Sequence, residues 1–282
     1  MTSLALDVYV SPMLEMAGGG HFSPTSSTII FGADEAIVVD TPYTRESVDE
    51  VIERIERSGR RLTAILVTHG HWDHYFGLDA LLERFPEARA WTIPSVAASI
   101  TDSLDQDRAD VRQYFDGAAL DNSAVPEALE GDEVTVDGEP VRLIELEQAD
   151  ISPTAIVHIP GLQAVIAGDA VYNGIHPFLA VTGPAEWQRW LASIDELEAL
   201  APKTVVAGHK RAEARDNDLE ATITATRAYI DEFSRAVEEM TSSRDVIEHM
   251  QSEFPDHDNP SALILSASTA MKRKKAASSH TE

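Results

Sequence analysis

A cluster of histidines directly after an apolar strand is the feature that most constrains what this chain can fold into. Residues 64–67 are typical of a short buried strand, and His69, His71, Asp73 and His74 follow it within six residues. In α/β folds, the carboxyl ends of strands bring polar side chains together at one sheet edge. Ten histidines in 282 residues seldom cluster in this way by chance, so a solvent-facing loop is the weaker interpretation. Imidazole and carboxylate groups bind divalent metals, which predicts a metal site here.

Two further strands end in the same manner, each with a glycine followed by a side chain that can bind metal. Asp169 follows residues 164–167 in the run AVIAGD, and His209 follows residues 204–207 in the run TVVAGH. Taken alone, Asp169 could cap a helix and His209 could be an ordinary loop histidine. Together with the cluster, these two residues complete a candidate set of six metal ligands.

The rest of the chain alternates strands and helices, which favours an α/β fold with helices on the outer faces of its sheets. Apolar and β-branched runs predict strands at residues 4–10, 26–31, 36–39, 64–67, 134–136, 141–147, 155–159, 164–167 and 204–207. Amphipathic spacing predicts helices at residues 44–58, 78–85, 185–200, 218–240, 244–254 and 260–271. Thr44 is a candidate N-cap of the first helix, and Gly59 lies where that helix should end.

The chain carries a formal net charge of −26 and contains no cysteine. The missing thiols exclude disulfides, cysteine-ligated zinc and iron–sulfur clusters. The negative charge repels phosphates and anionic lipid, so we expect neither a nucleic acid nor a membrane as partner. The first residues do not resemble a secretory signal, and no run of about 18 apolar residues predicts a transmembrane helix. We therefore expect a cytoplasmic protein that acts on a small-molecule substrate, with homo-oligomerisation left open.

Two segments stand out by their charge. Residues 95–139 hold twelve acidic and two basic side chains, and we interpret them as a partly helical surface insert. A lid or an oligomer contact is the alternative for this segment. Residues 272–275 form the only basic cluster, which is typical of a solvated helix end whose cations complement the helix dipole. A targeting signal or a contact with an anion is the alternative for residues 272–275.

At these residues the chain resembles the metallo-β-lactamase superfamily of hydrolases. Residues 69–74 match its H-x-H-x-D-H signature in full, Asp169 matches its metal-bridging aspartate, and His209 matches its last metal-binding histidine. Residues 26–42 resemble the paired strands that open the family fold. The resemblance implies a four-layer αβ/βα sandwich, in which two mixed β-sheets lie face to face with helices outside.

The resemblance covers residues 26–210 and suggests how the chain is divided. We expect a metallo-β-lactamase-like domain at residues 1–215, which includes the acidic insert. A helical C-terminal extension with the basic tail would follow at residues 216–282.

The resemblance also implies a role for each ligand, with two Zn²⁺ ions as the expected cofactor. His69 and His71 would bind metal 1, Asp169 would bridge, and metal 2 would be bound by Asp73, His74 and His209. Asp73 would in addition act in catalysis, by orienting the nucleophile and carrying a proton. A carboxylate such as Asp40 would fix the tautomers of the imidazoles through hydrogen bonds.

One family ligand is missing. A third metal-1 histidine usually stands in a turn that here corresponds to residues 147–154, which contain no histidine. Either Gln148 or Asp150 lies near the expected position. Asp150 offers a carboxylate oxygen and is the better ligand, whereas Gln148 offers only a neutral carbonyl. Either replacement changes metal 1, so iron or manganese stays open beside zinc.

The resemblance implies a hydrolase in which a metal-activated water attacks a carbonyl carbon. An aspartate at position 169, where several β-lactamases carry cysteine, is similar to the glyoxalase II, lactonase and phosphodiesterase-like branches. Hydrolysis of a small carbonyl ester, lactone or thioester is therefore the expected activity. The alternatives are a non-heme iron oxidoreductase similar to persulfide dioxygenases, a small phosphodiesterase, and a binding protein without activity.

Several side chains near the ligands are candidates for the substrate pocket. Gly18 to Gly20 give the chain a flexible run that could form a flap over the site. Ordinary loop or core positions are the alternative for every one of these candidates. The pocket candidates are Trp72, Tyr172, Asn173, His176, His21 and Phe22.

Overall fold

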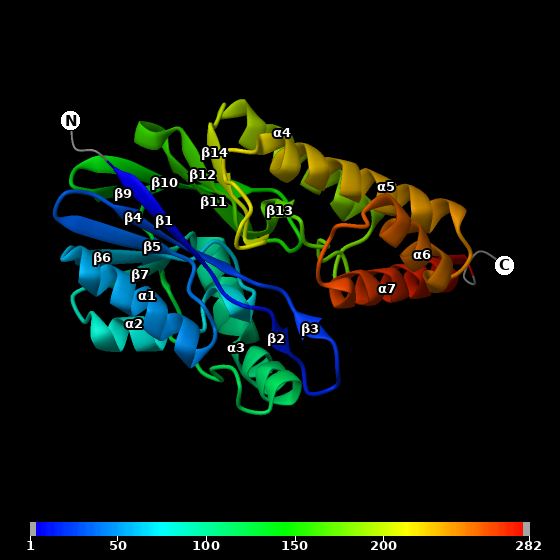
Figure 1. The fold of residues 1–282 in the computed structure, drawn as a ribbon, viewed down its shortest axis with the longest axis horizontal. Helices are drawn as coiled ribbons and strands as arrows, with labels where there is room; N and C mark the ends of the chain where they lie inside the picture. Colours follow the sequence, from blue (N-terminus) through cyan, green and yellow to red (C-terminus); the bar gives the residue numbers. More distant parts are fainter. Residues whose placement is uncertain (1–3, 279–282) are drawn as a thin grey trace.

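The computed structural model describes residues 4–278, and its framework is a pair of mixed β-sheets that face each other (Figure 1). The first sheet consists, in spatial order, of β1 (Ala5–Val10), β4 (Ser26–Phe31), β5 (Glu35–Val39), β6 (Arg61–Leu66), β7 (Arg89–Thr92) and β8 (Glu127–Ala128). The second consists of β14 (Thr204–Val206), β12 (Ala164–Ile166), β11 (Thr154–Ile159), β10 (Glu139–Leu146) and β9 (Glu133–Val136). In the first sheet β1, β4 and β5 are antiparallel neighbours, and β5, β6, β7 and β8 run parallel. Among the described strands of the second sheet, β12 and β14 are the parallel pair.

Helices cover the outer faces of both sheets, which confirms the predicted four-layer sandwich (Figure 1). On the first sheet lie α1 (Arg45–Ser58) and α2 (Leu78–Arg84), and on the second lies α4 (Pro184–Ala199). The remaining helices are α3 (Pro94–Phe115), α5 (Ala225–Glu239), α6 (Ser243–Glu253) and α7 (Pro260–Ser278). Short strands complete the fold as two pairs, β2 (Leu14–Glu15) with β3 (His21–Phe22) and β13 (Tyr172–Asn173) with β15 (His209–Lys210).

The first helix shows how local sequence signals set the boundaries of an element. The Thr44 hydroxyl accepts a hydrogen bond from the backbone N–H of Ser47 at 3.2 Å, as an N-cap does. Gly59 ends the helix with a φ of 69°, a conformation that glycine adopts at little cost. The predicted cap and stop are both confirmed. The buried stripe of the helix consists of Val48, Val51 and Ile55.

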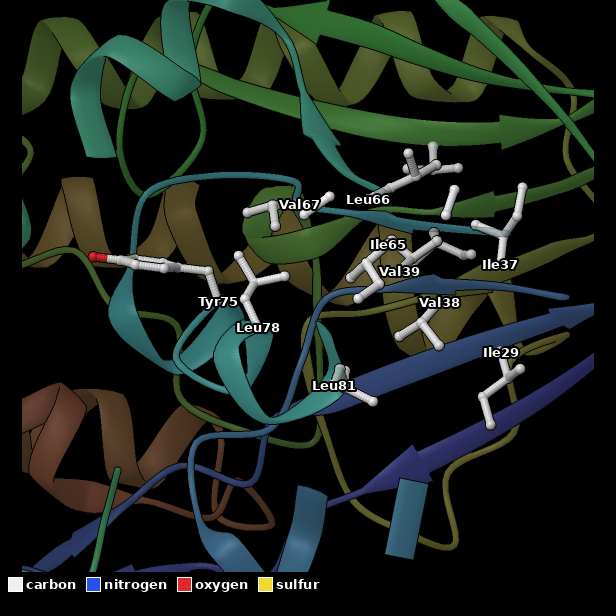
Figure 2. Packing of buried hydrophobic residues seen from close by; sticks show 14 of the residues in the cluster. Ile29, Ile37, Val38, Val39, Ile65, Leu66, Val67, Tyr75, Leu78 and Leu81 are labelled. Carbon is white, nitrogen blue, oxygen red and sulfur yellow. The ribbon is translucent and has the colours of Figure 1, made fainter. Parts of the chain in front are cut away.

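The core of the first sheet is a continuous apolar layer, shown in Figure 2. Ile37 and Val38 of β5 lie next to Ile65 of β6, and Leu81 of α2 lies in the same cluster. Strands β5 and β6 are apolar on both faces because a parallel pair in the middle of a sheet is covered on both sides. This rigid layer carries the turn that follows β6, which contains the histidine cluster.

The acidic segment 95–139 is partly helical, as predicted. Its first part is α3, a helix of 22 residues that buries Val111 and Phe115. Its later residues join both sheets, because β8 pairs with β7 and β9 pairs with β10. Among the described helices, none combines the length and the hydropathy that crossing a bilayer requires.

Part of the basic run 272–275 is bound within the fold. Lys274 of α7 donates to the carbonyl oxygens of Val237, Glu238 and Met240 at 2.9, 2.7 and 3.0 Å. These carbonyls lie at the C-terminus of α5, the negative end of that helix dipole. Lys274 therefore complements the dipole of α5, while Lys275 is exposed in the last turn of α7, the kind of helix end that the sequence predicted.

We expect Lys274→Met to lower the free energy of unfolding by about 1–2 kcal/mol, because the carbonyls at the end of α5 lose a charged donor. Urea unfolding followed by circular dichroism measures the change. Lys275→Met is the matched control, since this neighbouring side chain is exposed and should change stability very little. Equal stabilities of the two variants would contradict the assigned role.

Candidate metal centre

The ligand candidates meet because the ends of β6, β12 and β14 lie at one edge of the two facing sheets. His69 follows β6 and forms an antiparallel backbone bridge with Thr154 at the start of β11. This bridge places the turn with Asp150 against the histidine cluster. Asp169 lies in a short 3₁₀ turn after β12, and His209 begins β15 after β14. The indole N–H of Trp190 in α4 stabilises the Asp169 turn, because it donates a hydrogen bond to the carbonyl of Ala170 at 2.8 Å.

Two glycines allow the Asp169 and His209 turns to approach each other. The Gly208 N–H donates to the Gly168 carbonyl at 2.7 Å. A Cβ atom at Gly208 would lie 2.1 Å from Oδ1 of Asp169, so a larger residue would displace that carboxylate. The strand–glycine–ligand pattern seen in the sequence is therefore a packing requirement of this centre.

One group of possible ligands contains two imidazoles and two carboxylates. Ligand atoms of His69, His71, Asp150 and Asp169 all lie within 4.8 Å of one another. Nδ1 of His71 is 2.9 Å from Oδ2 of Asp150, and Nε2 of His69 is 3.9 Å from Oδ2 of Asp169. Of the two candidates for the missing ligand, the structure thus brings Asp150 into the group. Gln148 is not part of it, and its amide donates to the Ala149 carbonyl at 3.0 Å.

A second group lies next to the first and consists of Asp73, His74 and His209. Oδ2 of Asp73 is 3.3 Å from Nε2 of His74 and 3.5 Å from Nε2 of His209. Asp169 adjoins this group as well, with Oδ1 at 3.3 Å from Nε2 of His74 and Oδ2 at 3.0 Å from Nε2 of His209. Its carboxylate therefore stands between the two groups.

Several polar atoms of the centre are buried without a hydrogen-bond partner among residues 4–278. These atoms are Nε2 of His69, Nε2 of His74, Oδ2 of Asp150 and Oδ1 of Asp169. Burying polar atoms in this way is costly unless they bind something. All four are atoms that can donate electron pairs to a cation, so the donor set fits divalent metal ions at both groups.

The charges in the centre are strongly coupled. Burial, together with the imidazole of His74, holds the pKa of His69 well below its usual value. Burial also disfavours charge on His74, but the carboxylates of Asp73 and Asp169 outweigh it and raise the pKa of His74. Burial works to raise the pKa of Asp169, whereas His209 and His74 hold that pKa well below its usual range. A metal that replaces protons on these imidazoles would release the protons to solvent.

Side chains behind the ligands orient them. Asp40 accepts a hydrogen bond from Nδ1 of His74 at 2.9 Å, as the sequence analysis expected of this carboxylate. Asp40 also accepts from the N–H and the hydroxyl of Thr68, both at 2.8 Å. The Thr68 hydroxyl lies 2.9 Å from Nδ1 of His69 and can accept from it. These bonds leave Nε2 of both imidazoles free for a metal.

The remaining second-group ligands are held by the segment that precedes β4. The Thr25 hydroxyl donates to Oδ2 of Asp73 at 2.8 Å, and Nδ1 of His209 donates to the Pro24 carbonyl at 2.8 Å. Sequence reasoning missed Thr68, Thr25 and Pro24. No signal in the sequence distinguishes them, because only the packing of distant segments brings them to the ligands.

We expect Asp40→Asn to weaken metal binding by about 10–100-fold, because an amide cannot accept from three donors as the carboxylate does. Isothermal titration of the metal-free variant with Zn²⁺ measures the loss. Asp34→Asn, at an exposed turn, is the matched control and should bind as the unmodified chain does. An unchanged affinity in Asp40→Asn would show that the imidazoles need no such support.

Some pocket candidates lie beside the ligands. The Tyr172 hydroxyl donates to Oδ2 of Asp169 at 2.8 Å, and its ring stacks on His209 at 5.4 Å between centroids. Trp72 is largely buried and packs against Phe22, with ring centroids 4.6 Å apart. Phe178, which the sequence analysis did not single out, places its ring 5.9 Å from that of His71.

Other pocket candidates point elsewhere. Asn173 donates to the Thr222 hydroxyl at 2.8 Å, and Nδ1 of His176 lies 2.9 Å from the Tyr229 hydroxyl. Both contacts tie the loop after Asp169 to the C-terminal helices, so the structure brings neither side chain to the ligands. His21 is exposed at the start of β3, where it pairs with Glu15 of β2.

The buried position of His176 predicts a loss of stability in mild acid. Burial, with the imidazole of His257 nearby, lowers the pKa of His176 from 6.5 to about 4. The unfolded chain therefore binds this proton more readily, and the stability of the neutral form is lost as pH falls from 6.5 through 4. We expect His176 to contribute at most about 3 kcal/mol of that loss.

Urea unfolding between about pH 7 and about pH 4.5 measures this effect. His176→Gln keeps a polar contact to Tyr229 and should flatten the pH dependence. His21→Gln removes an exposed imidazole and should leave it unchanged. The same slope in His176→Gln and the unmodified chain would assign the acid sensitivity to other groups.

Comparison with known proteins shows related sequences and folds. The sequence profile of the Metallo-beta-lactamase superfamily matches residues 21–209. A hydroxyacylglutathione hydrolase from Cereibacter sphaeroides is 30% identical over 187 residues, which are 64% of this chain and 60% of that protein. This chain thus spans about 60% of the length of that relative.

Solved structures share the fold at lower identity. A metallo-beta-lactamase family protein from Thermus thermophilus is 18% identical with a TM-score of 0.63, covering 95% of this chain and 94% of that one. A beta-lactamase domain protein from Burkholderia ambifaria is 16% identical with a TM-score of 0.62, covering 96% of this chain and 86% of that one. The profile match contains the histidine cluster, Asp169 and His209, and the chain therefore belongs to the metallo-β-lactamase superfamily.

Proposed function

We propose that this chain is a metal-dependent hydrolase that cleaves a small carbonyl ester, lactone or thioester. One observation carries the proposal: two groups of buried ligand atoms lie side by side and share the carboxylate of Asp169. The similarity to a hydroxyacylglutathione hydrolase supports an acyl bond as the target. The buried polar atoms without hydrogen-bond partners argue for a site that still binds metal, and against a degenerate one.

The residues of the two groups would hold two divalent metals. The first ion would be held by His69, His71 and Asp150, the second by Asp73, His74 and His209, and Asp169 would contact both. Bound there, the metals would lower the pKa of a water molecule and polarise a carbonyl oxygen. Zinc is the expected ion, and the carboxylate of Asp150 makes the first group more favourable to iron or manganese than three imidazoles would be.

The surrounding side chains would direct the reaction. Asp73 belongs to the second group, and Thr25 fixes its carboxylate, so Asp73 could orient the attacking water and accept its proton. The hydroxyl of Tyr172 donates a hydrogen bond to Oδ2 of Asp169 and thereby positions that carboxylate. His71 is the most exposed ligand, with 25% of its side chain accessible, so the substrate would enter beside it.

An iron oxidoreductase is the second candidate, favoured by the two imidazoles and two carboxylates of the first group. The complete second group argues for a two-metal hydrolase instead, because a single-iron enzyme has no use for it. Metal analysis of the purified protein separates the two functions. About one iron per chain with no second metal would favour the oxidoreductase.

Turnover of a panel of aryl esters, lactones and acyl thioesters tests the proposed hydrolase. We expect hydrolysis of at least one class, loss of activity after chelation, and recovery when Zn²⁺ or Mn²⁺ is restored. His71→Ala should be inactive, whereas His158→Ala, near the end of β11 that is farther from the centre, should remain active. A fully metal-loaded protein that hydrolyses none of the panel would refute the proposal.

A further inference from the structure

Four segments of the chain surround the centre on the side where His71 is exposed. Phe22 of the β2–β3 hairpin packs near His209, with ring centroids 6.4 Å apart. Helix α3 lies against the turn between the first two histidines, where a Cβ at Gly70 would be 3.4 Å from Ile100 and 3.7 Å from the Ser99 hydroxyl. Phe178 faces His71 from the loop after Asp169.

The fourth segment begins α7 and joins the others. Ser261 accepts a hydrogen bond from the backbone N–H of His21 at 3.3 Å, and the side chain of Asn259 is hydrogen-bonded to Ser23. The backbone of Asp258 exchanges hydrogen bonds with the loop after Asp169, through the Gly174 carbonyl and the His176 N–H at 2.9 and 3.0 Å. The four segments, which we call the rim, comprise residues 11–23, 94–107, 174–183 and 255–261.

The rim contains no lysine and no arginine, although it contains six carboxylates. Three of these carboxylates, Glu15, Asp102 and Asp256, form no ion pair with any residue of the described chain 4–278 and are exposed. A fourth, Asp107, interacts electrostatically with His71 itself. The rim is therefore a source of negative potential directly beside the entrance to the centre.

Three arginines adjoin the rim, and groups of the chain itself already engage each of them. Arg108 contacts Asp105 at 3.0 Å, and Arg211 contacts Asp258 at 2.6 Å. Arg273 donates to the carbonyl of Thr182 at 2.5 Å. The rim imidazoles of His176 and His257 have pKa values lowered by burial, so they are neutral near pH 7. An anionic group on a substrate would therefore have to compete with acceptors of the chain itself for these arginines.

The metal ligands also disfavour an anionic substrate. With Asp150 in place of a histidine, the two groups contain three carboxylates: Asp73, Asp150 and Asp169. A metal-loaded centre of this kind is less positive by one charge than a centre with only two carboxylates. Attraction of an anionic substrate by the metals is weakened correspondingly.

Resting on the proposed hydrolase function, we propose that the substrate is a neutral or cationic acyl compound that carries no carboxylate or phosphate group. The glutathione part of a hydroxyacylglutathione carries two carboxylates, so this chain would act on a different leaving group from its curated relative. The specificity would come from the rim and from Asp150, not from the six ligands shared with the superfamily motif.

Three acetyl thioesters that differ in the charge of the thiol test the inference: N-acetylcysteamine (neutral), thiocholine (cationic) and 3-mercaptopropionate (anionic). Each kcat/KM is divided by the rate constant for cleavage by hydroxide, which removes differences in intrinsic reactivity. We expect the neutral and cationic thioesters to exceed the anionic one by about tenfold or more. Rising ionic strength should narrow this difference.

Ser99→Lys adds a cation to the rim, and Ser99→Gln is its uncharged match. The lysine variant should raise kcat/KM for the anionic thioester at least about threefold over the glutamine variant, and lower it for the cationic one. If the unmodified chain cleaves the anionic thioester as fast as the neutral one, the inference is wrong while the hydrolase function stands. If the metal-loaded chain cleaves none of the three thioesters, none of the matching oxygen esters and no lactone, the hydrolase function itself fails.

Discussion

Replacing Asp169 by asparagine is expected to lower kcat/KM for the best acyl substrate by at least about 10³-fold. The carboxylate stands between the two groups of ligand atoms, within 3.3 Å of His74 and 3.0 Å of His209. An amide of the same shape offers one neutral oxygen in place of two charged ones, so it cannot serve two cations at once. Steady-state kinetics and metal analysis of the same preparation measure both consequences.

The metal content should fall together with the rate, from two ions per chain to one or none. Asp195→Asn is a suitable control, because this exposed carboxylate pairs with Arg227 on the outer helices. Circular dichroism and urea unfolding show whether Asp169→Asn is folded. A folded variant that keeps both metals and most of its activity would remove Asp169 from the centre.

The second large effect concerns Asp150. We expect Asp150→Ala to weaken binding of one metal by about 100-fold or more. The binding free energy of a structural zinc site, divided among its four ligands, is about 3 kcal/mol per ligand. Oδ2 of Asp150 is buried and lies 2.9 Å from Nδ1 of His71, but it forms no hydrogen bond of suitable geometry within the described chain. Competition titrations of the metal-free protein with Zn²⁺ and Mn²⁺ measure the affinity and the preference.

Asp150→His tests whether the carboxylate of Asp150 sets the metal preference, because histidine keeps a ligand at this position but changes its type. An imidazole would restore the three-histidine set and should shift the preference toward Zn²⁺ by about tenfold or more relative to Mn²⁺. Gln148→Ala is the matched control in the same turn, and its metal affinity should be unchanged because Gln148 faces the Ala149 carbonyl. A loss of affinity in Gln148→Ala but not in Asp150→Ala would reverse the assignment.

The parts of this structure that the sequence predicted are those encoded by local patterns. The cap at Thr44, the stop at Gly59 and the apolar core strands follow from short-range rules and are confirmed. The strand–glycine–ligand runs around Asp169 and His209 were also visible, because ligands at the ends of strands have a fixed sequence context. The four-layer fold followed from the family resemblance, not from periodicity.

The parts that escaped prediction depend on contacts between distant segments. Strand β7 was not predicted, because Arg89–Thr92 is short and carries a charged and a polar residue at its ends. Asn173 and His176 were expected near the substrate from their closeness to Asp169 in sequence, but they contact Thr222 and Tyr229 of the C-terminal helices. The turn with Gln148 and Asp150 left two candidates, and only the backbone bridge at Thr154 places Asp150 beside the histidines.

Calorimetric titration of the metal-free protein with Zn²⁺ tests most directly whether the two ligand groups form a dinuclear metal centre. The geometry predicts two equivalents bound per chain, because each group offers its own buried donors and Asp169 adjoins both. Proton release should accompany binding, since imidazoles that carry protons in the metal-free centre must lose them. Saturation at two equivalents, with activity that appears as the second equivalent binds, is the predicted result. Saturation at one equivalent or none, in a folded protein at near-neutral pH, would contradict the dinuclear centre.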